Sequence, residues 1–121
     1  MPSSIHRPLL AFLLVAGCAP LWAHAVLQAS TPAAGASLAA SPAELRLSFN
    51  EALETGFSQV RLHDAGGTAV ATGELHAADG TAHTLVVPLK GPIAAGRYVV
   101  QWSAMGHDGH RTKGEFAFSV K

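Results

Sequence analysis

The segment Tyr98-Val-Val-Gln-Trp-Ser-Ala104 decides the fold class of this chain. Its apolar residues recur at every second position, which places Tyr98, Val100, Trp102 and Ala104 on one face of an extended strand. The same alternation occurs in four other segments, 45–49, 60–63, 85–89 and 116–120. A period of two with one apolar face is typical of antiparallel strands that bury one face. No segment keeps a helical period long enough to predict a helix.

Glycine, proline and aspartate predict turns between these strands, at 31–35, 64–67, 79–80 and 91–92. About seven short strands separated in this way predict an all-β fold, a Greek-key β-sandwich. Residues 37–40 could form a single turn of helix. The sequence Gly96-Arg-Tyr98 at a strand entry is similar to a tyrosine corner, in which the hydroxyl group bonds to upstream backbone.

Residues 1–23 have the features of a signal peptide. Arg7 precedes an apolar run at 9–17 that is too short to span a bilayer, and Ala23 offers a small residue before the cut. Cleavage there leaves residues 24–121 as one exported domain. Three alternatives remain, namely lipid attachment at Cys18, cleavage after Ala25, or retention as a membrane anchor.

The composition of the predicted domain excludes several classes of function. The chain has eight Lys and Arg and eight Asp and Glu; only Arg7 lies before residue 24, so the domain has seven basic and eight acidic residues. This near-neutral balance lacks the excess of basic residues that binding to nucleic acid or to an anionic membrane surface requires. The domain has no cysteine, which excludes disulfides and thiolate metal sites. No motif of a common enzyme is present, and the small size leaves little surface for a polymer substrate, so we do not expect an enzyme.

The segment Met105-Gly-His-Asp-Gly-His110 contains a candidate metal site. Asp108 and His110 are two residues apart, so in an extended chain they project to the same side. A carboxylate oxygen and an imidazole nitrogen that converge in this way suit Cu(II) or Zn(II). The alternative is a polar loop in which Asp108 and Gly109 form a turn.

His24 favours the metal interpretation, because cleavage before it would free a second nitrogen on the same residue. The α-amine, with a pKa of about 7.7–8, could close a chelate ring with Nδ1 of the imidazole. Together with Asp108 and His110 this gives three nitrogens and one oxygen, the ligand set that Cu(II) prefers. Met105 is the single methionine of the domain, which disfavours a thioether site for Cu(I). We therefore expect one Cu(II) ion.

Two further residues are candidates for axial or outer contacts at this site. Glu51 follows a predicted strand, and its carboxylate could bond to the amine or to a ligand imidazole. The alternative for Glu51 is an exposed charge at a strand end. His107 is out of phase with Asp108 and His110, so we expect it outside the ligand set or in solvent. The remaining histidines of the domain are expected to be solvated, His63, His76 and His83.

Several motifs, in this order and spacing, resemble the CopC-type periplasmic copper-resistance proteins. The resemblance covers residues 24–121 and rests on His24, Ser30-Thr-Pro-Ala-Ala-Gly35, Leu45-Arg-Leu-Ser-Phe-Asn-Glu51, Leu89-Lys-Gly-Pro-Ile-Ala-Ala-Gly-Arg-Tyr98, Trp102-Ser-Ala-Met-Gly-His-Asp-Gly-His110 and Gly114-Glu-Phe-Ala-Phe-Ser-Val120. It implies a cupredoxin-like or immunoglobulin-like sandwich. It also implies a Cu(II) site at His24, Asp108 and His110, and the acidic residue that follows an early strand in the family falls on Glu51.

The resemblance further implies a periplasmic protein that buffers or delivers copper, in some members beside an inner-membrane copper importer. The methionine-rich Cu(I) loop of some members is missing between Leu62 and Leu85. Two other functions stay open. One is a copper oxidase of histidine-brace type, which also uses an N-terminal histidine. The other is a metal-free sandwich that binds a protein partner.

Overall fold

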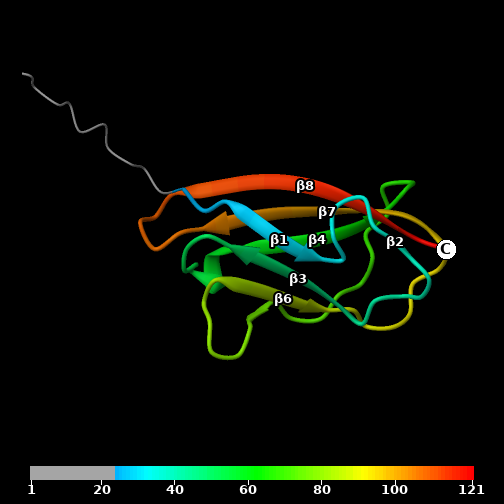
Figure 1. Ribbon diagram of the computed structural model, residues 1–121, viewed down its shortest axis with the longest axis horizontal. Helices are drawn as coiled ribbons and strands as arrows, with labels where there is room; N and C mark the ends of the chain where they lie inside the picture. The colour runs from blue at the N-terminus through cyan, green and yellow to red at the C-terminus, as the bar shows by residue number, and fades with distance from the viewer. Residues whose placement is uncertain (1–23) are drawn as a thin grey trace, which may run out of the picture.

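The computed structural model describes residues 24–121, so the signal peptide predicted for residues 1–23, with Cys18, lies outside the described residues. Eight strands and one short 3-10 helix make up the described chain (Figure 1). In chain order these are β1 (Leu27–Thr31), β2 (Ser37–Leu38), β3 (Glu44–Phe49), the 3-10 helix η1 (Thr55–Phe57), β4 (Gln59–Asp64), β5 (His76–Ala77), β6 (Thr84–Pro88), β7 (Gly96–Met105) and β8 (Arg111–Val120). Residues 24–121 include no helix that is long and apolar enough to cross a membrane.

The strands form two four-stranded sheets, with the orders β1-β3-β6-β5 and β2-β8-β7-β4. Neighbouring strands are antiparallel except β2 and β8, which are parallel. The predicted all-β sandwich is therefore confirmed. The structure has eight strands where about seven were expected. Of these, β2 and β5 contain two residues each, too few to show a period in the sequence. Part of the turn considered at 37–40 is in fact strand β2.

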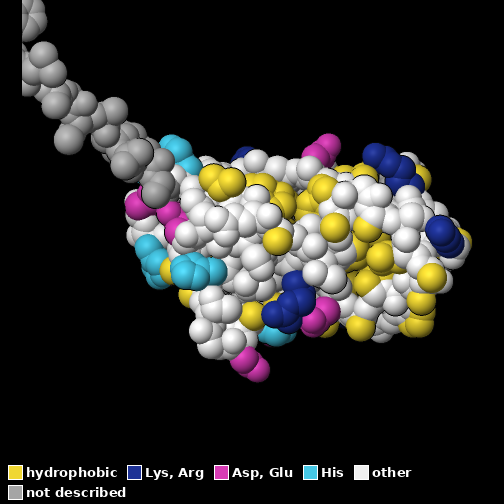
Figure 2. Space-filling model, viewed as in Figure 1, with side chains coloured by type: hydrophobic (Ala, Val, Ile, Leu, Met, Phe, Trp, Pro, Cys, Tyr) yellow, Lys and Arg dark blue, Asp and Glu magenta, His cyan; other side chains and the backbone are white. Residues whose placement is uncertain are grey.

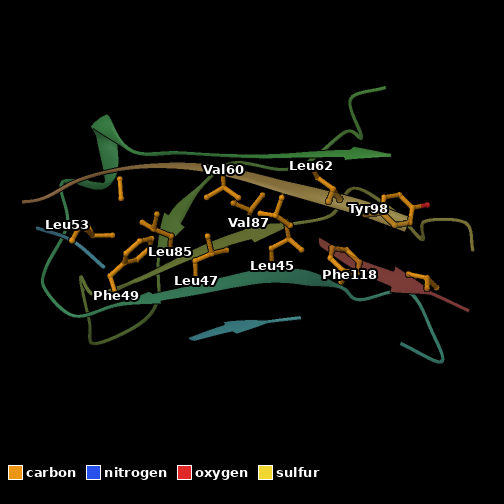
Figure 3. Close-up of a cluster of buried hydrophobic side chains, with 14 residues drawn as sticks. Leu45, Leu47, Phe49, Leu53, Val60, Leu62, Leu85, Val87, Tyr98 and Phe118 are labelled. Atoms are coloured by element: carbon orange, nitrogen blue, oxygen red, sulfur yellow. The ribbon is translucent and has the colours of Figure 1, made fainter. Parts of the chain in front are cut away.

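The core lies between the two sheets (Figure 3). The largest side chains that are at most 1 % exposed come from both layers, Leu45, Leu47, Leu62, Leu85, Val86, Val87, Val100 and Phe118. All of them except Val86 occupy the core phase of the alternating segments, as predicted. Burial of each such side chain contributes about 1.5–3 kcal/mol, so this layer accounts for most of the stabilisation of a domain without disulfides.

Aromatic contacts fix the two ends of the sandwich. At one end the Tyr98 hydroxyl donates a hydrogen bond to the carbonyl oxygen of Ala94 at 2.6 Å, which confirms the tyrosine corner. Tyr98 also stacks on Phe118, with 5.6 Å between ring centroids. Toward the other end, Phe49 and Trp102 meet edge to face at 5.1 Å. That end also carries the turn between β7 and β8 and the start of the described chain (Figure 1).

Candidate functional site

The first three described residues are held against the sandwich. Asn50, directly after β3, accepts a hydrogen bond from the Val26 backbone N–H at 2.7 Å through Oδ1, and its Nδ2 donates to the His24 carbonyl oxygen at 3.3 Å. From β8, the Thr112 hydroxyl donates to the Ala25 carbonyl oxygen at 2.8 Å. The Ala25 side chain is 3 % exposed and belongs to the core. The backbone of His24 is therefore held in place, while its side chain is exposed.

The turn between β7 and β8 carries Asp108 and His110. It is closed by hydrogen bonds from the Gly106 N–H to the His110 carbonyl oxygen and from the Gly109 N–H to the Gly106 carbonyl oxygen, both at 3.0 Å. Gly109 has a φ of +82°, a conformation that favours glycine. The prediction that an extended chain directs Asp108 and His110 to one side is therefore wrong in its geometry. The alternative turn at Asp108 and Gly109 is present, and it still brings the two side chains together.

The Asp108 carboxylate accepts two hydrogen bonds from His110. Oδ2 lies 2.9 Å from Nδ1 of the imidazole, and Oδ1 accepts from the backbone N–H at 3.0 Å. The side-chain hydrogen bond and then the backbone hydrogen bond hold the pKa of Asp108 below its ordinary value of 3.8, and the nearby His24 acts in the same direction. Asp108 is therefore a persistent anion, and it fixes the orientation of the His110 ring.

The imidazoles of His24 and His110 lie edge to face, with 5.3 Å between their centroids and 74° between their planes. These two residues come from opposite parts of the sequence, and the packing of the first residues against β3 and β8 brings them together. Figure 2 shows histidine and acidic side chains at the end of the molecule where the described chain begins. Residues His24, Asp108 and His110 are thus assembled at one place, as the sequence predicted.

Glu51 also faces this place. Its Oε1 is buried and has no hydrogen-bond partner in the structure. A Cβ built on Gly106 would collide with that oxygen and would lie 2.9 Å from Oδ1 of Asp108, so both carboxylates border the same space above Gly106. A buried carboxylate oxygen without a partner is costly, and a cation is one way to compensate it. Glu51 is thus half-buried beside the site and is not the exposed strand-end charge considered as the alternative.

His107 is turned to a different partner. Its Nδ1 lies 2.6 Å from Oε1 of Glu54, and both side chains are about half exposed, at 58 % and 46 %. This contact agrees with the expectation that His107 stays outside the ligand set. His76 and His83 are exposed, as expected. His63 differs from the expectation, because it is half-buried and its Nδ1 is buried without a hydrogen-bond partner.

The described residues do not present a finished ligand cage: within 24–121, no three His, Cys, Asp or Glu side chains already converge on one point as metal ligands. The two imidazoles and the Asp108 carboxylate nevertheless offer nitrogen and oxygen donors side by side. The donor types fit a borderline divalent ion such as Cu(II).

Sequence reasoning missed the residues that support this site. Asn50 holds the backbone of His24, Thr112 holds that of Ala25, and Gly106 leaves room for the carboxylate of Glu51. One signal could have found Asn50: an asparagine that directly follows a strand is a frequent partner for neighbouring backbone groups. The roles of Thr112 and Gly106 depend on contacts across the fold, which no local pattern reveals.

Comparison with known proteins agrees with this architecture. The profile of the CopC domain matches residues 27–121. Protein YobA of Escherichia coli K12 is 38 % identical over 101 residues, which cover 84 % of this chain and 82 % of YobA. Among solved structures, CopC from Methylosinus trichosporium OB3b has a TM-score of 0.76 at 28 % identity and covers 81 % of this chain and 94 % of its own. PcoC, described as a methionine-rich copper resistance protein from Escherichia coli, has a TM-score of 0.75 at 30 % identity, with 82 % and 100 % covered. The chain therefore belongs to the CopC domain family.

Proposed function

We propose that this protein binds one Cu(II) ion through His24, Asp108 and His110 and buffers or delivers copper in the periplasm. The observation that carries the proposal is the meeting of His24 and His110, whose ring centroids lie 5.3 Å apart with the Asp108 anion beside them. The hydrogen bonds between Asp108 and His110 hold the turn, and His24 reaches it from a distant part of the chain, so that two imidazoles and a carboxylate lie together at this surface. Their donor chemistry is what a Cu(II) ion requires.

Each residue has a distinct part in the proposed site. His110 uses Nδ1 for its hydrogen bond to Asp108, so it would ligate through Nε2. A carboxylate has about four lone-pair positions, so Asp108 can keep its hydrogen bonds and still coordinate an ion. Cleavage after Ala23 would add the α-amine of His24 as a third nitrogen. Glu51, with its buried oxygen at the same space, would supply an axial or outer carboxylate.

The proposed preference for Cu(II) over Cu(I) rests on the scarcity of soft ligands in this chain. PcoC is described as methionine rich. This chain has two methionines in all, and of these only Met105 lies after residue 24. Thioether and thiolate ligands favour Cu(I), whereas imidazole and carboxylate suit Cu(II). We therefore propose a non-enzymatic carrier, which would hand its ion to an acceptor such as an inner-membrane copper transporter.

The test is a Cu(II) titration against a competing chelator, on exported protein whose intact mass shows a start at His24. We expect one ion per chain and a tetragonal electron paramagnetic resonance spectrum. His24→Ala and His110→Ala should each weaken Cu(II) binding at least about tenfold, because even outer contacts change metal affinity by about 10–100-fold. His76→Ala, which removes an exposed histidine on β5, is the matched control and should change nothing.

Three results would contradict the proposal. Unchanged affinity in both His24→Ala and His110→Ala would exclude this site. Rapid peroxide production from ascorbate and oxygen by the copper-loaded protein would favour an oxidase of histidine-brace type. Absence of any stoichiometric Cu(II) binding would favour a metal-free sandwich that binds a protein partner. A lipidated start at Cys18 would remove the α-amine from the ligand set.

A further inference from the structure

The backbone of residues 24–26 is fixed by both sheets. On the side of β3, Asn50 makes three hydrogen bonds to it: Oδ1 accepts from the Val26 N–H at 2.7 Å, the Asn50 N–H donates to the Val26 carbonyl oxygen at 3.1 Å, and Nδ2 donates to the His24 carbonyl oxygen at 3.3 Å. The side-chain amide of Asn50 thus accepts a hydrogen bond from Val26 and donates one to His24. No other asparagine occurs in the chain.

On the side of β8, Thr112 holds the residue between these two contacts. Its hydroxyl donates to the Ala25 carbonyl oxygen at 2.8 Å, and the Ala25 methyl group is buried in the core at 3 % exposure. Asn50 directly follows β3 and Thr112 lies in β8, and these strands belong to different sheets, so residues 24–26 are clamped between the two layers. We call these contacts the N-terminal clamp: the hydrogen bonds of Asn50 and Thr112 to residues 24–26, with the buried Ala25 side chain.

The clamp has a direct consequence for His24. Residues at the start of a domain are usually disordered unless they are tied down. A disordered His24 would have to lose its conformational freedom each time an ion binds, which would weaken binding. In this structure the His24 ring lies edge to face against His110, with 5.3 Å between the ring centroids.

We infer that Asn50 and Thr112 are positioning residues, which act through His24 to hold a copper ligand in place before the ion arrives. This inference rests on the proposed Cu(II) function but adds residues that touch no ion. According to this inference, the polar groups of Asn50 and Thr112 increase the affinity for Cu(II) as well as the stability of the fold.

The first measurement is the Cu(II) affinity of three single variants with a common control. Asn50→Ala and Thr112→Val should each weaken binding by about tenfold, the effect of about one lost hydrogen bond on an equilibrium. Thr112→Ser keeps the hydroxyl and should bind like the wild type. Ser41→Ala is the matched control, because Ser41 Oγ also accepts a backbone hydrogen bond, from the Ile93 N–H, but lies before β3 whereas Asn50 follows it. It should lower the melting temperature without changing the affinity.

The second measurement is a double-mutant cycle with His24→Ala. If Asn50 acts through His24, Asn50→Ala should weaken Cu(II) binding clearly less in His24→Ala than in the wild type, because His24→Ala has lost the imidazole and keeps only the α-amine for Asn50 to position. Equal weakening in both backgrounds would mean a general loss of structure and would overturn the inference. Wild-type affinity in Asn50→Ala and Thr112→Val would overturn it too. Either result would leave the proposed function intact so long as His24→Ala and His110→Ala still weaken binding.

Discussion

Replacing Gly106 by alanine would test whether the two carboxylates must lie where the structure places them. Gly106 is buried in the turn between β7 and β8, and its φ is outside the positive region, so the backbone tolerates alanine. The added methyl group would collide with Oε1 of Glu51 and lie 2.9 Å from Oδ1 of Asp108. An ordinary carbon–oxygen contact needs about 3.3 Å or more, so Asp108 must retreat by a few tenths of an ångström and Glu51 by more.

These displacements translate into a measurable loss of affinity. Metal sites tolerate about 0.2 Å in ligand distances, and a disturbed outer contact lowers affinity by about 10–100-fold. We therefore expect the dissociation constant for Cu(II) to rise about 10–100-fold in Gly106→Ala, equivalent to about 1.4–2.8 kcal/mol. Overpacking should also lower the free energy of unfolding, by about 1–3 kcal/mol.

The assay is chelator competition at fixed pH, with the melting temperature recorded on the same samples. Gly91→Ala is the matched control, because a Cβ at Gly91 meets nothing within 4 Å and its φ is not positive. Adding Glu51→Ala to Gly106→Ala removes the larger collision and should restore part of the folding stability. If Gly106→Ala folds and binds Cu(II) within about twofold of the wild type, the carboxylates are not confined by Gly106 and the reasoning is refuted.

Three other perturbations have defined outcomes. Tyr98→Phe removes the hydroxyl hydrogen bond of the tyrosine corner and should lower the free energy of unfolding by about 1 kcal/mol in urea titrations, with Cu(II) affinity unchanged. Asp108→Asn removes a carboxylate whose pKa is lowered in the folded state, so the wild type should be the more stable protein above about pH 4. This difference in stability should fade as the pH falls below 3.8, the ordinary pKa of the group. Urea titrations between pH 2.5 and 7 measure it, and a difference that grows in acid would contradict the prediction. His107→Ala breaks an exposed contact with Glu54, so chelator competition should show Cu(II) affinity within about threefold of the wild type and melting curves should shift little.

The fold could be predicted from the sequence wherever one face of a strand is buried. In β3, apolar residues alternate with polar ones because one side of the strand faces the core, and this alternation is visible in the sequence at Leu45, Leu47 and Phe49. The two residues of β5 are too few to show an alternating pattern, and only their pairing with β6 defines them as a strand. Tyr98 was predictable for another reason, since its hydroxyl bonds to a residue four positions upstream.

The sequence predicted which residues would meet at the candidate site, but not the geometry of the turn that carries two of them. His24, Asp108 and His110 attract attention through their residue types, which can be read from the sequence without the fold. The turn at Asp108 is set by hydrogen bonds to His110, and these replace the extended geometry that spacing suggests. The buried oxygen of Glu51 depends on a glycine far away in the sequence, so spacing could not reveal it.

The direction of β8 has a practical consequence for handling the protein. This strand begins beside the candidate site and runs through ten residues to Val120, which at about 3.3 Å per residue places Lys121 some 30 Å from the site, at the opposite end in Figure 1. A fluorophore, an affinity tag or a solid support attached after Lys121 would leave the two imidazoles open to solution. The same attachment ahead of His24 would block the amine, so a surface-tethered copper sensor should be coupled through the C-terminal side.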